Sequence, residues 1–145
     1  MKLKTLVLDS SVVLKWFWSQ DEAEVEAARN IYAYALKNNI VLMAPHFLLI
    51  EISNVLLRAK KLSRGKTQQV LNSLTEGDIL FQSDSEVDLH KTMYYADRYH
   101  LSMYDALYLQ LAEKYQCPLI TADAALANAG SWPCTIEKFT QKYMS

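Results

Sequence analysis

Short apolar runs typical of buried strands alternate along this chain with segments of helical periodicity, and this alternation limits the possible folds more than any other feature. We expect strands at residues 5–8, 40–44, 79–82, 118–121 and about 133–136. We expect helices between them, at residues 20–38, 47–62, 66–76, 85–100, 102–115 and 124–129. Strands that alternate with helices are typical of a parallel sheet covered on both faces. The sequence therefore predicts an α/β fold.

Signals at the ends of these segments place several of the helices. Ser19 and Glu22 form a capping-box pattern, which predicts that a helix begins near residue 20. Pro45 suits the first turn of the next helix. Residues 47–62, FLLIEISNVLLRAKKL, are apolar over most of a helical surface, so we expect this helix to lie deep in the fold. The strand near 133–136 is expected to finish the domain.

Length and composition indicate one globular domain over residues 1–145. The chain is 51% apolar and 21% charged, and three glycines and three prolines leave little room for linkers. Asp9 and Lys15 interrupt the apolar N-terminal run, so it does not resemble a signal peptide, and no stretch is long enough to span a membrane. Cys117 and Cys134 lack metal-ligand spacing and are expected to be reduced thiols. These features favour a cytoplasmic protein.

Two of the expected strands end in an acidic residue. Asp9 follows the run TLVL directly, and Asp123 follows PLIT one residue further on. In open parallel sheets, ligands bind beyond the carboxyl ends of the strands. If both strands are central, the two carboxylates lie at the same edge of the sheet. Each acid also precedes a segment that looks helical, so a structural role as an N-cap is the alternative.

Two further acids stand in helices. Glu51 lies in a nearly all-apolar segment, where burial of a lone carboxylate is costly. Its alternative role is in a narrow solvated stripe, because Asn54 and Arg58 share its helical face. Asp105 stands three residues after Ser102, where a capping-box acid belongs, and that role alone could explain it.

A site that brought these four acids together would need cations. Carboxylates that converge repel one another, and some become protonated unless positive charge neutralises them. Mg²⁺ and Mn²⁺ prefer oxygen ligands, and such ions can orient and activate a water molecule against a phosphodiester. No cluster of cysteine and histidine indicates zinc. The pattern therefore favours a hydrolase that uses one or two Mg²⁺ or Mn²⁺ ions.

Four segments in this order resemble the PIN-domain ribonucleases, and especially the VapC-type toxins of prokaryotic toxin–antitoxin pairs. They are VLDSSVVLKWF at 7–17, PHFLLIEISNVLLR at 45–58, and the continuous LSMYDALYLQLAEKYQCPLITAD at 101–123, which holds both the YDALYLQLAE and the ITAD segments. The resemblance covers nearly the whole chain. It implies a three-layer α/β/α sandwich around a central parallel sheet, with Mg²⁺ or Mn²⁺ in an acidic pocket. It also implies an RNA substrate, an antitoxin partner and a homodimer.

The same resemblance assigns roles to individual residues. It matches the four acids of the family to Asp9, Glu51, Asp105 and Asp123. It matches polar positions that support the site to Ser11, Asn54 and Thr121, and hydrogen bonds of this kind are expected around ligating carboxylates. The alternative for these three small polar residues is local capping.

The charge of the chain is the main feature that differs from a typical nucleic-acid-binding protein. The formal net charge is -1, and Ala124 and Ala125 follow Asp123 where relatives often carry a basic residue. The run RAKKLSRGK at 58–66 is the only dense cationic stretch in the sequence. It is either a solvated helix end, where cations suit the helix dipole, or a contact for the RNA backbone.

Aromatic residues leave two alternatives open. Trp16, Trp18, Tyr104 and Tyr108 could stack on bases. Core or interface packing is the simpler role for the two tyrosines, which stand four residues apart on a helix. The two tryptophans could instead anchor a surface for an antitoxin or a second subunit.

Three other functions remain open at this stage. An aspartate-based phosphatase of the haloacid-dehalogenase type also places an acid after its first strand, but its second aspartate would fall at Ser11. A PIN nuclease of general RNA processing would share the same active site. A non-catalytic PIN-like module would act only through a partner.

Overall fold

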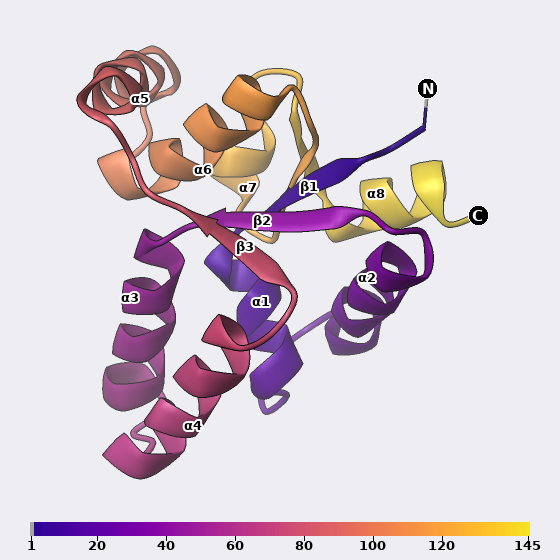
Figure 1. Ribbon diagram of the computed structural model, residues 1–145, viewed down its shortest axis with the longest axis vertical. Helices are drawn as coiled ribbons and strands as arrows, with labels where there is room; N and C mark the ends of the chain where they lie inside the picture. The colour runs from indigo at the N-terminus through magenta and orange to yellow at the C-terminus, as the bar shows by residue number, and fades with distance from the viewer. Residues whose placement is uncertain (1) are drawn as a thin grey trace.

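Five parallel strands form one sheet in the order β3-β2-β1-β4-β5 (Figure 1). The computed structural model describes residues 2–145. The strands are β1 (Thr5–Leu8), β2 (Val41–Pro45), β3 (Ile79–Gln82), β4 (Leu119–Thr121) and β5 (Pro133–Thr135). All five lie within two residues of their predicted positions, and the parallel sheet is confirmed.

The central strand β1 holds the core together. Leu6, Val7 and Leu8 have no exposed surface, as expected for a strand buried on both faces. Val7 is paired with Met43 of β2 on one side and with Leu119 of β4 on the other. The two strands that are followed by Asp9 and Asp123, β1 and β4, are therefore neighbours in the sheet.

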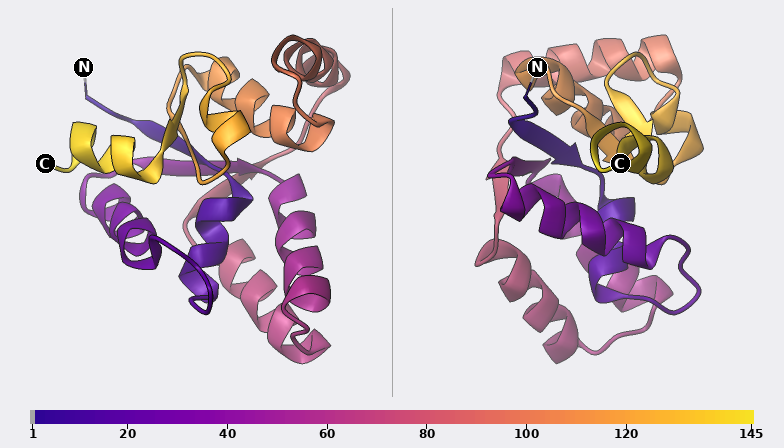
Figure 2. Two further views of the ribbon diagram at one scale, coloured as in Figure 1. Left: turned by 180° about the vertical axis from the view of Figure 1, so that it is seen from behind. Right: turned by 90° about the vertical axis from the view of Figure 1, so that its right-hand side faces the viewer.

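Helices cover both faces of the sheet (Figures 1 and 2). They are α1 (Ser10–Phe17), α2 (Val25–Lys37), α3 (Phe47–Asn54), α4 (Arg64–Thr75), α5 (Glu86–Tyr99), α6 (Met103–Tyr115), α7 (Ala124–Ala127) and α8 (Ile136–Tyr143), with a π-helical segment at Val55–Ala59. Helix α6 packs against β1, β2 and β4, and α5 lies outside it. Helices α1 and α2 cover the other face, with α8 beside α2. The three-layer α/β/α sandwich is confirmed.

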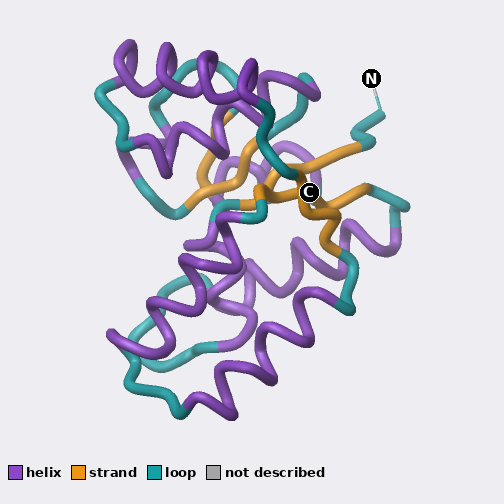
Figure 3. The backbone as a smooth tube through the Cα atoms, turned by 60° about the vertical axis from the view of Figure 1, so that its left-hand side comes forward, coloured by secondary structure: helices purple, strands orange, loops and turns teal. Residues whose placement is uncertain are grey.

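Helix α3, the π-helical segment and α4 form a hairpin that extends away from the sheet (Figure 3). Leu48, Ile52 and Leu56 are buried along one side, whereas Ile50 is 63% exposed. The prediction that this helix lies deep in the fold is therefore wrong, because only one of its apolar sides faces the core. Within residues 2–145, no helix is both long and apolar enough to cross a membrane.

Two predicted boundaries are also wrong. The helix expected from residue 20 begins at Val25, because Glu22 forms an ion pair with Lys15 at 2.9 Å instead of a capping box with Ser19. Pro45 ends β2 and is paired with Gln82, so it does not open a helix.

The chain continues past β5 into helix α8, which the sequence analysis missed. The hydroxyl of Thr135 accepts a free amide in the first turn of this helix, that of Lys138, at 3.2 Å. Ile136 and Phe139 stand three residues apart and are both buried against the sheet. This spacing is the signal that could have predicted the helix.

A buried carboxylate, Asp88, joins α5 to α6. It forms a complete capping box with Ser85, with bonds of 3.0 and 3.1 Å. Gln110 and Lys114 of α6 donate to the same carboxylate at 3.1 Å. The backbone hydrogen bond from Ser85 is the largest cause that lowers the pKa of Asp88, to about 2.

We predict that Asp88→Asn lowers the free energy of unfolding at neutral pH by about 1–2 kcal/mol, because charged hydrogen bonds are lost while Lys114 stays partly exposed. The folded pKa of about 2 lies below the ordinary value of 3.8, so the stabilisation is complete above 3.8 and disappears as pH falls through about 2. Urea unfolding measures the free energy of unfolding of both proteins. The difference between wild type and variant should become smaller as the pH is lowered from 3.8 to about 2. Asp97→Asn, at an exposed position of the same helix, is the control, and an equal effect of both variants would contradict the prediction.

Candidate active site

Asp9 lies at the carboxyl end of the central strand, and the fold holds it firmly. It is 4% exposed and is the N-cap of α1, accepting from the Ser10 amide at 2.9 Å. Its own backbone amide donates to the carbonyl of Ile120 in β4 at 3.0 Å. The N-cap role proposed for Asp9 is therefore real, but it uses only one carboxylate oxygen.

Two hydroxyl groups fix the second oxygen of Asp9. Ser11 donates to Oδ2 at 2.6 Å and Thr121 donates to it at 2.8 Å. Each hydroxyl also accepts a backbone amide: Ser11 that of Ala122, and Thr121 that of Asp123, both at 2.9 Å. These bonds tie the end of β4 to the start of α1. They also set Asp123 at the same edge of the sheet as Asp9, as predicted.

Asp123 has a different environment from Asp9. Its side chain is exposed and caps the short helix α7, accepting from the Leu126 amide at 2.9 Å. The capping role foreseen for it is confirmed. One carboxylate oxygen of Asp123 thus orients the helix, and the exposed side chain remains accessible to a ligand.

Glu51 comes from α3 and is held by a residue that the sequence analysis did not assign to the site. The hydroxyl of Tyr108 donates to Glu51 Oε1. Tyr108 has no exposed surface, and burial together with the charges of Asp9 and Glu51 raises its pKa, so the hydroxyl keeps its proton. Base stacking by Tyr108 is therefore wrong. A tyrosine in the middle of a buried helix was the available signal, because a buried hydroxyl needs a partner.

Asp105 lies in the first turn of α6. Ser102 accepts the Asp105 amide at 3.1 Å, so this helix is capped. The reciprocal bond from the Asp105 carboxylate, which completes the capping box at Ser85 and Asp88, is not formed between these two described residues. The structural role suggested for Asp105 thus uses its backbone and leaves its carboxylate available.

The four acids act on one another electrostatically. Burial is the largest cause that raises the pKa of Asp9, and the charge of Asp123 raises it further. Burial also raises the pKa of Glu51 and of Asp105, with additional repulsion from Asp9 in both cases. Glu51 and Asp105 repel each other, and Asp123 repels Asp105. The carboxylates therefore share one electrostatic environment, in which added positive charge would be stabilising.

The donor set fits a hard divalent cation in its chemistry. All four candidate ligands are carboxylates, and oxygen ligands are those that Mg²⁺ and Mn²⁺ prefer. Within residues 2–145, no three acidic, histidine or cysteine side chains are grouped closely enough to hold an ion by themselves. Mg²⁺ commonly keeps several waters and binds through one or two carboxylates and a substrate phosphate. The open arrangement is compatible with that mode.

The sequence profile of the PIN domain matches residues 6–131 of the chain. The chain belongs to the PIN-domain family. It is 32% identical over 129 residues to Ribonuclease VapC1 of Mycobacterium tuberculosis, with 81% of this chain and 97% of that protein covered. The resemblance found in the sequence is therefore confirmed at the level of the family.

Solved structures show the same fold. VapC20 of Mycobacterium tuberculosis, described as a sarcin–ricin loop cleaving toxin, has a TM-score of 0.71 at 15% identity, over 86% of this chain and 95% of that chain. A toxin–antitoxin complex from Klebsiella pneumoniae has a TM-score of 0.68 at 17% identity, over 90% and 97% of the two chains.

Other residues of interest in this PIN domain lie outside the acidic cluster. Asn54 is exposed at the end of α3, and its side chain makes no hydrogen bond within the described part of the chain. Tyr104 is 57% exposed and stacks on Phe47, with ring centroids 4.7 Å apart. Lys60, in the cationic run at 58–66, lies 5.5 Å from the ring of Trp18.

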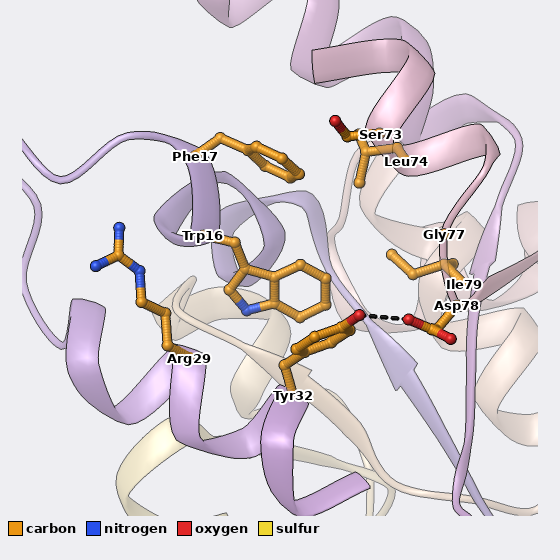
Figure 4. Close-up of a pocket in the computed structure, with 9 residues that line it drawn as sticks. All are labelled: Trp16, Phe17, Arg29, Tyr32, Ser73, Leu74, Gly77, Asp78 and Ile79. Atoms are coloured by element: carbon orange, nitrogen blue, oxygen red, sulfur yellow. Dashed lines mark hydrogen bonds between the residues drawn. The ribbon is translucent and has the colours of Figure 1, made fainter. Parts of the chain in front are cut away.

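A cavity of about 400 Å³ opens in this PIN domain between α1, α2 and α4 (Figure 4). Trp16 and Tyr32 lie side by side in its wall, with ring centroids 4.9 Å apart. The Trp16 indole donates to the carbonyl of Ala28 at 3.0 Å, and the Tyr32 hydroxyl donates to Asp78. None of the four acids lines this cavity. Trp16 is thus part of an apolar hollow separate from the acidic cluster.

We predict that Thr121→Val weakens Mn²⁺ binding by roughly 10–100-fold, because loss of a hydrogen bond that orients a ligating carboxylate has about that effect. The substitution conserves shape but removes the hydroxyl that joins Asp9 to the Asp123 amide. Isothermal titration calorimetry measures the change. Thr75→Val, at an exposed position of α4, is the matched control. Equal Mn²⁺ affinities for both variants and wild type would contradict the prediction.

Proposed function

We propose that this PIN domain is a metal-dependent endoribonuclease that uses Mg²⁺ or Mn²⁺ to hydrolyse RNA. The observation that carries the proposal is the electrostatic coupling of Asp9, Glu51, Asp105 and Asp123 at the carboxyl edge of the sheet. Its similarity to Ribonuclease VapC1 supports RNA as the substrate.

One or two of the four acids would bind the cation directly, and the others would add negative charge around it. Asp9 offers a carboxylate fixed by three hydrogen bonds, whereas Asp123 offers an exposed one from the start of α7. Glu51 and Asp105 approach from α3 and α6. A bound Mg²⁺ or Mn²⁺ supplies an activated water and neutralises charge on the phosphodiester.

The remaining residues position these carboxylates. Ser11 and Thr121 orient Asp9, and they favour its charged form by donating to it. The Tyr108 hydroxyl orients Glu51 and favours its charged form by donating to it. A bound cation would offset the repulsion among the carboxylates and favour the charged forms of Asp9, Glu51 and Asp105. Asn54, which the family resemblance places near the site, would contribute only by direct contact with RNA from its exposed position.

We further propose that the protein is the toxin of a toxin–antitoxin pair. The related VapC1 and VapC20 and the Klebsiella pneumoniae toxin–antitoxin complex support this assignment. A small antitoxin would block the acidic edge, and the hollow beside Trp16 and Phe17 offers apolar contacts to such a partner. The proposed activity implies a cytoplasmic location, where RNA is made.

A homodimer is the oligomeric state that we propose. Several apolar side chains of α3 and α5 are well exposed, including Ile50 and Val87 at 63%, Tyr94 at 60% and Met93 at 54%. Burial of such side chains against a second copy would be favourable.

The competing functions are less well supported. A phosphatase would use Asp9 as a nucleophile, yet one carboxylate oxygen is already bound by both Ser11 and Thr121. A general RNA-processing nuclease shares the chemistry proposed above and differs only in its effect on the cell. A non-catalytic module would have no need for four mutually repelling carboxylates.

We predict that Asp9→Asn and Asp105→Asn each reduce RNA cleavage by at least about 100-fold, since even outer partners of a metal ligand are worth 10–100-fold. Asp105→Asn is the sharper test, because Ser102 caps α6 through the backbone of residue 105 and the helix is unaffected. Cleavage of a labelled RNA is measured with Mg²⁺, with Mn²⁺ and with EDTA. Glu76→Gln, at an exposed acid at the end of α4, is the control. Undiminished cleavage by both aspartate variants would overturn the proposal.

The toxin assignment has its own test. We predict that inducible expression of the wild-type protein in a bacterial host arrests growth within a few generations, and that Asp105→Asn at equal protein level does not. Optical density after induction is the measurement, with immunoblotting as the check on expression. Normal growth with the wild type, together with RNA cleavage in vitro, would instead favour a nuclease of general RNA processing.

A further inference from the structure

A second hollow lies at the opposite edge of the sheet from the acids. Its volume is about 760 Å³, and it is lined by the residues that precede β1 and β4, by β5 and by α8. Residues near both ends of the described chain contribute to its lining, namely 2–5 at one end and Lys142 and Tyr143 at the other. Lys4 and Asp9 flank the same strand, so about five residues at about 3.3 Å each, or roughly 16 Å, separate the two edges.

Four lysines line this hollow: Lys2, Lys4, Lys138 and Lys142. All four are exposed, and none forms an ion pair with any residue among 2–145. The described lining includes no aspartate or glutamate. In a chain whose formal net charge is -1, this is a local concentration of positive charge.

The two lysines of α8 stand four residues apart and face the hollow together. Their charges act on the thiol of Cys134, although burial raises the pKa of that thiol to about 11. Lys142 also lies 5.1 Å from the ring of Tyr143. Lys2 and Lys4 bring positive charge from the other end of the sequence, so only the folded chain creates the cluster.

Aromatic rings accompany these lysines. Tyr115, Trp132 and Tyr143 line the same hollow, and Tyr115 is 42% exposed. The Trp132 indole donates to Glu113 at 3.0 Å, which fixes the orientation of its ring. Lysines that neutralise phosphates beside rings that stack on bases are the combination found in proteins that bind single-stranded nucleic acid.

We propose that this lysine and aromatic hollow is a second binding site, which holds the backbone of single-stranded RNA at a distance from the acidic edge. The inference rests on the proposed function in that it takes RNA as the substrate. The acidic edge repels phosphates, so attraction from another part of the surface is needed for RNA to approach. Lysines act as hydrated point charges and do not read sequence, so the site binds RNA of any sequence.

RNA fits these observations better than an acidic peptide does. A peptide rich in carboxylates would use the lysines but would gain little from three aromatic rings. A mononucleotide would engage one or two lysines, whereas the four come from both ends of the chain and surround a hollow of about 760 Å³. An extended polyanion with planar bases uses both the spread of the charges and the rings.

Salt dependence of binding provides the test. Fluorescence anisotropy of a labelled oligouridylate is measured in EDTA, which prevents metal-dependent cleavage, between about 50 and 200 mM salt. For single strands, each phosphate contact contributes about 0.7 to the slope of log K against log salt. Lys138→Gln combined with Lys142→Gln should therefore reduce the slope by about 1.4 and weaken binding several-fold at low salt.

A matched pair controls for net charge. Lys91→Gln with Arg98→Gln removes the same two charges from exposed positions of α5, away from the hollow, and should leave the slope unchanged. Lys138→Arg with Lys142→Arg keeps the charges and should retain RNA binding, which separates loss of charge from loss of folding.

Several outcomes would overturn the proposal. Equal losses from the two glutamine pairs would mean that only net charge matters, and no loss from the α8 pair would mean that the hollow does not bind RNA. Competition by polyglutamate as effective as that by RNA would assign the site to an acidic protein, and competition by AMP at similar concentrations would assign it to a mononucleotide. Because no cleavage is measured, these outcomes are independent of the nuclease assay with Asp9→Asn and Asp105→Asn.

Discussion

The Thr121 hydroxyl links the two strands on which the candidate active site depends. It donates to Asp9 at the end of β1 and accepts the amide of Asp123 just beyond β4. Thr121 is fully buried, so this bond forms where water does not compete for it. The hydroxyl of Ser11 in α1 acts in the same way, because it donates to Asp9 and accepts the amide of Ala122. Without these two hydroxyls, Asp9 would be a buried carboxylate with a single partner, which is a costly state. The position of one acid and the spacing between two strand ends are thus set by the same hydrogen bonds.

The other acids reach this edge through helices, and each is constrained in a different way. Tyr108 carries its hydroxyl to Glu51 from the interior of α6, and Ser102 caps α6 through the backbone of Asp105. The structural roles of Asp9 and Asp123 as helix caps are real, yet each cap uses only one carboxylate oxygen. Capping and catalysis are therefore compatible uses of the same residues. The protein tolerates mutual repulsion among its carboxylates, which is typical of functional sites and unlike the stabilising network around Asp88.

Charge is distributed unequally between the two edges of the sheet. The carboxyl edge holds four acids, and the opposite edge holds four exposed lysines with aromatic rings among them. The formal net charge of -1 conceals both groups, because they nearly cancel in the sum. A bound polyanion would experience attraction at one edge and, until cations bind, repulsion at the other. This polarity connects the proposed chemistry of the acids with the proposed binding of RNA.

The sequence alone determined the class of fold, and it predicted that Asp9 and Asp123 lie at the same edge of the sheet. Buried strands such as β1 appear in the sequence as continuous aliphatic runs. Asp9 and Asp123 each follow such a run, which predicted that they share an edge of the sheet. Local signals were less reliable where tertiary contacts competed with them. Glu22 pairs with Lys15 instead of capping α2, and α3 leaves Ile50 exposed despite its apolar sequence. The Tyr108–Glu51 contact spans 57 residues, and the lysine hollow joins the two ends of the chain, so neither leaves a local pattern. These features were decided only by the tertiary structure, because the free energy of such contacts depends on which distant groups the fold brings within reach.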